Sequence, residues 1–540
     1  MSGLMDHLAI LPIVLPLLAG ALMIMLGDQR RSLNGAIGLV SMAAMLVMAV
    51  LLLRQADAVG GSGLPAAVYR LGDWPASFGI VLVVDRLTAL MLLLAAILGL
   101  AALTFSLARW HRIGAHFQPL VQFQLMGLNG AFLTGDLFNL FVFFEVMLAA
   151  SYGLALHGSG AARVRAGLHY IAINLAASLL FLIAASLIYG VSGTLNMADL
   201  AARIPSLTGP DRMLLEVGAA ILGIVFLVKA GMWPLGFWLP GTYAAASPPA
   251  AALLSILSKV GIYAVLRLWL LLFSGEAGES AGFGGTWLLF GGILTIGFGT
   301  FAVLATQDMS RLAGASVLVS SGTLLAAIGT GQVGVTSGAL MYMVSSVLAI
   351  AAFFLVIDLA ERGREVGADV LAVSLEAFGE GDDEEPTEGE EIGIAIPATM
   401  AILGISFMAC ALLLAGLPPF SGFLAKFAIL SPLLGSSDAG RAVPTGTWVL
   451  VAALIISGLA TLVAMTRTGI NTFWGSLDDK HLRVRVIELA PVALLLSLCI
   501  GLTVLAGPAM RYMESTAQAL HQPGGYVRGV LSPTNGGNGS

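Results

Sequence analysis

Four ionisable side chains lie inside stretches of the sequence that are otherwise apolar, and these are Glu145, Lys229, Lys259 and Lys426. A charged group at membrane depth is costly unless a partner offsets its desolvation. Each of these residues therefore needs a permanent partner, or it carries its charge for only part of the time. The chemistry that a carboxylate and three amines offer in such a setting is the uptake and release of protons.

The use of lysine in this chain supports that interpretation. Of 25 basic residues, 21 are arginine and four are lysine, and three of the four lysines fall within apolar segments. Lysine normally populates protein surfaces. Arginine does not release its proton in a protein, whereas a buried lysine can. The pattern favours sites that must gain and lose a proton in a dry interior.

Glu145 and Lys229 would form a switch if they lie close together. A nearby carboxylate stabilises the protonated amine, and moving the carboxylate away favours release of the proton, because coupled groups share their titration. The alternative is a permanent ion pair that joins two helices. Ionisable groups inside a membrane are by default markers of an ion pathway.

The segments that hold these residues must be membrane-spanning helices. Hydrophobic residues make up 58% of the chain and charged residues 10%, against about 25% charged residues in a soluble domain. A span needs about 20 apolar residues. The sequence predicts an all-α polytopic membrane protein with fourteen spans, which start near residues 4, 32, 80, 114, 137, 167, 213, 247, 285, 311, 335, 394, 446 and 486. The net charge of −6 does not suggest a nucleic-acid partner.

Two of the predicted spans are interrupted close to a lysine. Pro234 follows Lys229 by about one turn, and Pro418 and Pro419 precede Lys426 by about two turns. Proline inside a span frees backbone carbonyls and allows the helix to unwind locally. A simple proline kink would explain either break alone. Breaks in the seventh and twelfth spans, five spans apart, are typical of inverted-repeat transporters.

This spacing predicts four regions. They are the first three helices (1–110), a first five-helix repeat (111–275), a second five-helix repeat (276–475) with an acidic inner loop (362–393), and the last helix with the C-terminal tail (476–540).

The distribution of basic residues predicts the orientation. With the N-terminus outside, the inner loops hold thirteen basic residues and the outer loops and tail hold seven, which the positive-inside rule favours. Both termini are therefore expected on the outer side of the membrane, in the periplasm or its equivalent. The acidic run at 379–391 is expected in an inner loop, and SGTLNMADLAARIP between the sixth and seventh spans is expected to form a short amphipathic helix on the outer surface.

Several other polar residues lie near span ends. His169, at the start of the sixth span, could accept protons at the inner mouth or serve only as a polar cap. Asp85 and Arg86 begin the third span and are interpreted as an anchoring or helix-packing pair. Arg267 is expected near an outer helix end, with its charged head reaching water.

Long motifs in the chain resemble a known family of membrane proteins. LFNLFVFFEVM, YIAINLAASLLFL, GTLNMADLA, KAGMWPLGFWLPGTYAAASPPAAALLSILSKVGIYAVLR and LPPFSGFLAKF are similar to the large antiporter-like subunits of Mrp-type multisubunit cation/proton antiporters and of the membrane arm of respiratory complex I. The resemblance covers about residues 80–475. The loop WLPGTYAAASPPAAALLSILSKVG resembles the D-type subunit of the Mrp antiporters.

The resemblance implies a fold, a function and a role for each matching residue. It implies fourteen helices with two inverted repeats and broken seventh and twelfth helices. Glu145 would modulate Lys229, Lys259 would relay protons to the centre, and Lys426 would lie at the exit of the half-channel. The implied partners are the other subunits of the complex, the lipid bilayer, H+, and Na+ or K+, and no cofactor is expected.

The chain departs from the family pattern in the eleventh span. Many relatives carry a histidine and a lysine there, and this chain has Ser346 and Ile350 at about those positions. Water together with Ser320, Ser321, Ser345 and Ser346 could bridge Lys259 to Lys426, although serines in membrane helices also satisfy backbone carbonyls or pack helices.

The sequence thus predicts a proton-translocating subunit of a monovalent cation/proton antiporter. Two alternatives remain open, a proton-pumping subunit of a redox complex (complex I-like or a membrane-bound hydrogenase) and a structural membrane scaffold.

Overall fold

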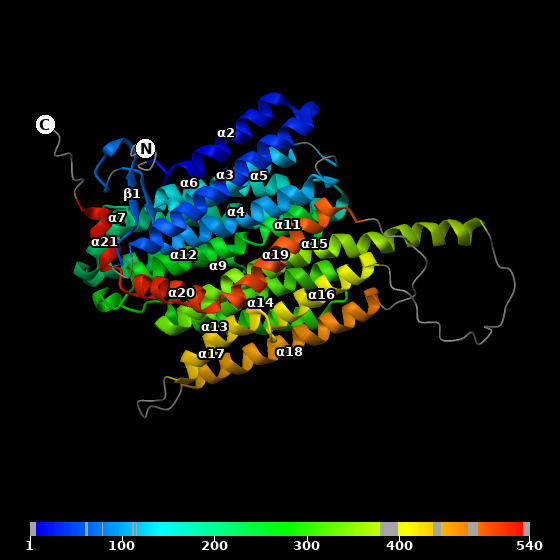
Figure 1. Ribbon diagram of the computed structural model, residues 1–540. Helices are drawn as coiled ribbons and strands as arrows, with labels where there is room; N and C mark the ends of the chain where they lie inside the picture. The colour runs from blue at the N-terminus through cyan, green and yellow to red at the C-terminus, as the bar shows by residue number, and fades with distance from the viewer. Residues whose placement is uncertain are drawn as a thin grey trace.

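The computed structural model describes residues 7–59, 63–77, 79–110, 113–114, 116–377, 398–435, 444–473 and 484–532. The acidic run at 379–391 and the last residues of the tail, 533–540, lie outside these ranges. The described chain is an elongated bundle whose long helices run roughly along one direction (Figure 1).

The first region contains three helices and one hairpin. Helices α2 (Leu11–Leu26), α3 (Arg31–Ala58) and α4 (Arg86–Ser106) pack side by side, and strands β1 (Ala67–Arg70) and β2 (Val81–Val84) connect α3 to α4. The strands pair antiparallel, with Ala67 opposite Val84.

A buried side-chain amide supplies the hydrogen bond that α2 lacks because of Pro16. Pro16 has no N–H, so the carbonyl of Pro12 loses its helical partner. Asn129 donates to that carbonyl at 2.8 Å. Polar side chains at helix contacts can therefore be structural here, and burial alone does not identify a pathway residue.

The second region is also a bundle of helices, and it contains Glu145, Lys229 and Lys259. Its helices are α5 (Phe117–Leu133), α6 (Leu137–Ala155), α7 (Ala161–Ser192), α8 (Met197–Arg203), α9 (Gly209–Ala230), α10 (Trp238–Ala245), α11 (Pro248–Leu254) and α12 (Leu257–Leu272). The short helix expected in SGTLNMADLAARIP is α8, and its N-terminus is capped by Asn196, which accepts from the N–H groups of Ala198 and Asp199.

The remaining helices complete the bundle. They are α13 (Gly285–Ala305), α14 (Met309–Gly329), α15 (Val333–Ala377), α16 (Ala398–Ala415), α17 (Ser421–Gly435), α18 (Thr445–Phe473), α19 (Val486–Val504), α20 (Ala506–His521) and α21 (Gly524–Leu531). Helix α15 continues to Ala377, so the loop predicted from residue 362 begins as helix.

Both ends of the chain contribute to the same end of the bundle. The β1–β2 hairpin and α21 lie together there (Figure 1), and Arg70 donates to the carbonyl of Val530 at 2.9 Å. We call this the terminal end of the molecule, defined by β1, β2 and α21.

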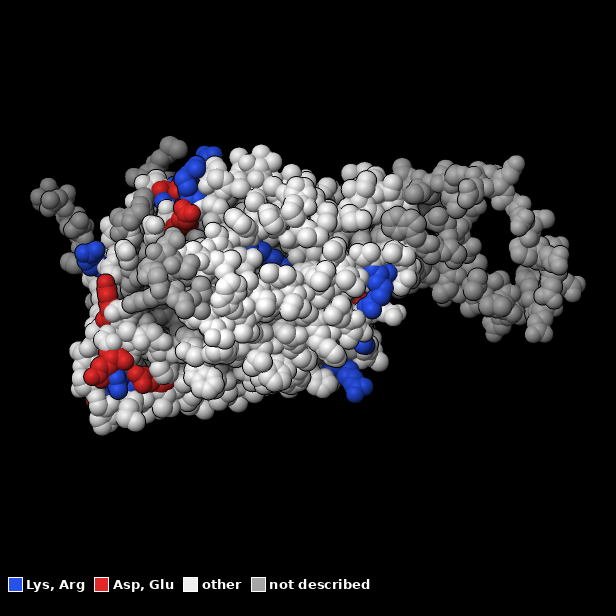
Figure 2. Space-filling view, turned by 90° about the horizontal axis from the view of Figure 1, so that it is seen from below, with Lys and Arg blue, Asp and Glu red and all other residues white. Residues whose placement is uncertain are grey.

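The bundle is built to span a membrane. Among the described residues, eleven helical segments are long and apolar enough to cross one, and three shorter apolar helices accompany them. Charged side chains gather at the two ends of the face shown in Figure 2, and a broad, almost uncharged belt separates them. The protein is therefore a polytopic membrane protein, whereas the number of crossings and the inverted repeats stay predictions.

The two predicted breaks have the same local structure. Helix α9 ends at Ala230 and α16 ends at Ala415, and the next residue in each case is a glycine in the left-handed region, Gly231 (φ 77°) and Gly416 (φ 76°). In both, the residue after the glycine donates back to the carbonyl five positions earlier. This is a helix C-terminal motif that favours glycine, and a proline follows each glycine three residues later.

Candidate functional site

Lys229 lies in the last turn of α9, directly before the first break. Its side chain is 4% exposed, and its amine has no hydrogen-bond partner among the described residues. The ring of Phe144, whose centroid lies 5.1 Å from the amine, stabilises its charge. A buried ammonium without an acceptor is unusual, so the residue is not explained as a permanent ion pair.

Glu145 projects from α6 toward the same region. It is half-buried, it accepts a hydrogen bond from Ser178 of α7, and it interacts electrostatically with Lys229. No direct ion pair between Glu145 and Lys229 is present in the described structure. The structure therefore brings the predicted pair together but holds the carboxylate on a different partner.

Lys259 is completely enclosed near the start of α12. Its amine donates to the hydroxyl of Ser321 on α14 at 3.4 Å. The end of α9 packs directly against α12 here, because a Cβ added at Gly261 would lie 2.6 Å from the backbone nitrogen of Ala230. This contact holds Lys229 and Lys259 in neighbouring positions.

Lys426 caps the second break. It projects from α17, and its amine donates to the carbonyl of Ala415 at the end of α16 at 2.8 Å. That carbonyl is at the negative end of a helix, which favours a positive charge. Gly458 of α18 leaves the space for this side chain, since a Cβ there would lie 3.3 Å from the amine.

The four predicted serines lie between Lys259 and Lys426. Ser320 donates to Ser346 at 2.9 Å, and Ser345 is 2.8 Å from the hydroxyl of Ser421, the first residue of α17. A small cavity touches Ser320, Ser345 and Ser346, with about 10 Å³ open to the centre of a water molecule. That is about the space that one water needs, so the cavity has room for one water beside the hydroxyl pairs that link α14 to α15 and α15 to α17.

His169 does not join this group. It is exposed on the first turns of α7, and its Nδ1 contacts the carbonyl of Arg165 one turn earlier.

The structure adds buried polar groups that the sequence did not single out. Tyr243 and Ser247, around the end of α10, and Trp238 at its start are at most 4% exposed and have polar atoms without hydrogen-bond partners in the described structure. Gln124 of α5 is fully buried with both amide atoms unpartnered. Buried polar groups of this kind usually hold ordered water.

The interpretation of Arg267 was wrong. It is 6% exposed and forms a two-pronged ion pair with Asp85, at 2.5 and 2.7 Å, so its charge is held by a carboxylate at the wall of a small pocket and does not extend freely into water. Arg86, the expected partner of Asp85, instead pairs with Asp57 at 3.0 Å. The two partners Asp85 and Arg267 are far apart in the sequence, and no local pattern links them.

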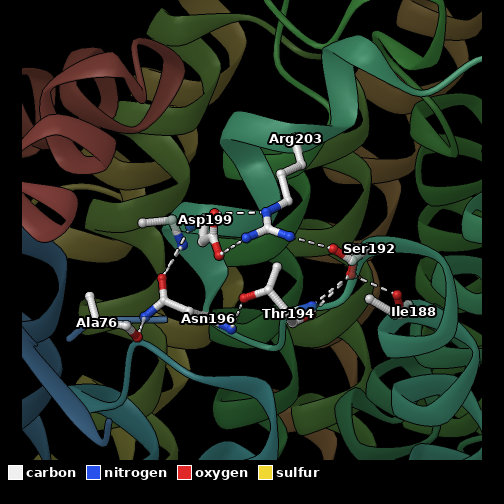
Figure 3. A network of polar contacts seen from close by, with 8 residues as sticks. Ala76, Ile188, Ser192, Thr194, Asn196, Asp199 and Arg203 are labelled. Atoms are coloured by element: carbon white, nitrogen blue, oxygen red, sulfur yellow. Dashed lines mark hydrogen bonds and ion pairs between the residues drawn. The ribbon is translucent and has the colours of Figure 1, made fainter. Parts of the chain in front are cut away.

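A second two-pronged pair lies at the surface of the terminal end. Arg203 contacts both carboxylate oxygens of Asp199 at 2.9 and 2.8 Å and also donates to the carbonyl of Ser192 (Figure 3). Asn196 ties this helix to the carbonyl of Ala76 at 2.9 Å. The network fixes α8 on the bundle.

Comparisons with known proteins identify a family. Residues 134–450 match the model of a family described as NADH:quinone oxidoreductase/Mrp antiporter, transmembrane. A Rhizobium meliloti protein described as a probable K+/H+ antiporter subunit of the D type is 58% identical over 540 residues, which is 100% of both chains. A D-type Na+/H+ antiporter subunit of Alkalihalophilus pseudofirmus is 34% identical over 98% of this chain and 100% of that relative.

A solved structure shows the same fold. A chain in the Mrp complex from Dietzia sp. DQ12-45-1b superposes with a TM-score of 0.81 at 24% identity, covering 98% of this chain and 99% of that chain.

Proposed function

Since the chain belongs to the NADH:quinone oxidoreductase/Mrp antiporter family of transmembrane proteins, we propose that it is the proton-translocating subunit of a multisubunit K+/H+ or Na+/H+ antiporter. The relatives are antiporter subunits, so the chain is a transporter subunit and not a self-contained enzyme. Its partners are the other subunits of the complex and the lipid bilayer. K+ is the first cation to test, because the 58% identical relative is described as a K+/H+ antiporter subunit.

The observation that carries this proposal is the state of Lys229. Its amine is buried, close to a carboxylate, and without a hydrogen-bond partner among the described residues. A structural lysine at this depth would be expected to hold a permanent acceptor. An amine that alternates between its charged and neutral forms does not need one.

Glu145 is the switching partner in this proposal. When its carboxylate leaves Ser178 and approaches Lys229, the ammonium form is stabilised and a proton is taken up. When the carboxylate returns to Ser178, the proton moves on to Lys259, whose position next to α9 is held by the contact at Gly261.

From Lys259 the proton crosses to Lys426 through hydroxyl groups and water. Ser321 accepts from Lys259, and the pairs Ser320–Ser346 and Ser345–Ser421 lead to the start of α17. The cavity beside Ser345 and Ser346 supplies a water position between them. A hydroxyl can accept one proton and donate another, so serines can replace the histidine and lysine of many relatives.

The orientation of the protein in the membrane is inferred from the distribution of basic residues. Thirteen basic residues against seven favour the terminal end as the outer, periplasmic side of a bacterial inner membrane. In the proposed path, protons enter at Glu145 and Lys229, and Lys426 lies near the point where they leave the protein.

The test is ion-dependent proton movement in vesicles that hold the complete complex, followed with a pH-sensitive dye. Glu145→Gln, Lys229→Ala and Lys426→Ala should abolish or strongly reduce it. Lys229→Arg keeps the charge but cannot cycle a proton, so it should fail as well. Lys480→Ala, which removes the one lysine outside the apolar segments, is the matched control and should transport normally.

Transport by Lys229→Ala at the wild-type rate would overturn the proposal. Loss of assembly with unchanged transport per assembled complex would instead identify a structural scaffold.

A further inference from the structure

Helix α12 carries three polar side chains on one face. Lys259, Tyr263 and Arg267 follow one another at intervals of four residues, so each lies about 6 Å further along the helix than the last. All three are at most 6% exposed. The proposed transfer from Lys229 to Lys426 uses only the first of them.

Tyr263 and Thr88 meet at one backbone carbonyl. The hydroxyl of Tyr263 donates to the carbonyl of Phe132 at 2.6 Å, and Thr88 donates to the same oxygen at 2.9 Å. The two hydroxyls are 3.4 Å apart. This arrangement brings α4, α5 and α12 together at the turn between Lys259 and Arg267.

Arg267 closes the far side of this cluster. It donates to Thr88 at 3.3 Å and holds both carboxylate oxygens of Asp85. Tyr526 of α21 lies over its guanidinium group, with the ring centroid 5.1 Å away. Arginine does not give up its proton, so Arg267 is a fixed positive charge that opposes the passage of another.

A solvent pocket reaches this ion pair from the terminal end. It has about 30 Å³ open to water centres, which is room for about two waters. Asp85 and Arg267 line it, together with Gly63 and with Pro523 and Tyr526 of the C-terminal segment. Polar side chains thus follow one another from the enclosed Lys259 to this opening.

We propose that α12 carries a second branch of the proton path, which leaves Lys259 through Tyr263 and Thr88 and opens at Asp85, and that the Asp85–Arg267 pair is its gate. The branch rests on the function proposed above. In the arrangement described here the gate is closed, because Arg267 occupies both oxygens of Asp85.

The transfer needs no co-reactant. Lys259 gives its proton to a water on the face of α12, and the hydroxyl of Tyr263 accepts a proton while it releases its own. Thr88 repeats this exchange, and Asp85 accepts the proton once Arg267 has moved away. Water in the pocket then takes it, so Tyr263, Thr88 and Asp85 return to their starting forms, and Lys259 stays neutral until Lys229 supplies its next proton.

The test uses the whole complex in vesicles. Tyr263→Phe removes one hydroxyl and leaves the Phe132 carbonyl bonded to Thr88, so the fold should be preserved while cation-driven proton movement is lost or slowed. Asp85→Asn should have the same effect. Glu279→Gln, which removes the carboxylate of the exposed ion pair with Arg212, is the matched control and should transport normally.

A double variant separates a gate from a structural ion pair. Asp85→Asn with Arg267→Gln removes the fixed positive charge, and water from the pocket that both residues line replaces Asp85 as the acceptor, so an imposed pH gradient should collapse without added K+ or Na+. A purely structural pair predicts only less assembled complex and no leak. If Asp85→Asn does not assemble, Tyr263→Phe decides, because wild-type transport by that variant overturns the branch.

Lys229→Ala and Glu145→Gln are measured in parallel. If these two transport normally, the proposed function fails. Suppose instead that Lys229→Ala and Glu145→Gln lose transport. If Tyr263→Phe and Asp85→Asn then transport normally and the double variant holds its pH gradient, only the proposed branch is overturned.

Discussion

At the scale of single residues, the position of Lys426 depends on what is missing around it. Its stem passes Gly416, where a Cβ would lie 2.5 Å from its Cδ, and its amine passes Gly458 before it reaches the carbonyl of Ala415. Both glycines therefore fix the position of Lys426 through the space they leave. They have no polar side chain of their own.

We predict that Gly458→Ala reduces transport by displacing Lys426. The new methyl group would lie 2.7 Å from the oxygen of Ala415 and 3.3 Å from the amine. Overpacking of this kind costs roughly 1–3 kcal/mol, so the complex should still assemble. The measurement is proton movement per assembled complex, with Gly501→Ala as the control, because a Cβ at Gly501 meets nothing within 4 Å. Equal transport by both variants would contradict the argument.

The residues found from the sequence are those whose charge conflicts with an apolar segment. Glu145, Lys229, Lys259 and Lys426 stood out for that reason, and the structure encloses the three lysines. Ser178, Tyr243 and Gln124 did not, because hydroxyl and amide groups are common in membrane helices and their meaning depends on the neighbouring helix. The roles of Glu145, Lys229, Lys259 and Lys426 in transport stay predictions.

At the scale of elements, the two breaks place the site. Two of the three buried lysines lie at the C-terminal end of a helix, Lys229 within the last turn of α9 and Lys426 against the end of α16. Prolines in the sequence predicted both interruptions. The pairing of Asp85 with Arg267 was missed because it joins α4 to α12, and sequence patterns describe one helix at a time.

The hairpin of α5 and α6 gives a prediction about pH. His157, just beyond α6, is buried against Phe117, and burial lowers its pKa below the ordinary value of 6.5, with a smaller contribution from the Arg163 charge. The unfolded chain then binds the extra proton more readily than the folded chain, so stability falls as the pH drops below about 6.5. His157→Gln should reduce the difference in melting temperature between pH 7.5 and pH 5.5 in detergent.

The exposed His169 is the control for this measurement. His169→Gln should leave the difference between the two pH values as it is in the wild type. An unchanged difference in His157→Gln would show that other groups cause the loss of stability.

At the scale of the whole molecule, the almost uncharged belt of Figure 2 between two charged ends is the arrangement expected of a protein that spans a bilayer. The sequence predicted the class of fold well, because twenty-residue apolar segments have few alternatives in a membrane. It could not give the packing order of the helices, which depends on contacts such as those of Gly261 and Gly292 with neighbouring backbones.

The orientation can be tested directly. Glu279 is exposed at the terminal end, where Arg212 contacts it at 2.7 Å, and Ser159 lies in the turn between α6 and α7. A cysteine at 279 should react with a membrane-impermeant thiol reagent added to whole cells, and a cysteine at 159 should react only after the cells are opened. The natural cysteines, Cys410 and Cys499, are buried and should give little background. The reverse pattern would place the terminal end in the cytoplasm.

The hydroxyl bridge through α15 has an electrical consequence. Serine has no stable charged form, so a proton crossing Ser320, Ser346, Ser345 and Ser421 never resides there, unlike a proton on histidine or lysine. The membrane voltage does work on every charge that moves through it. In this chain its effect on proton occupancy would therefore fall on the lysines on either side, because the eleventh span would hold no charge between transfers.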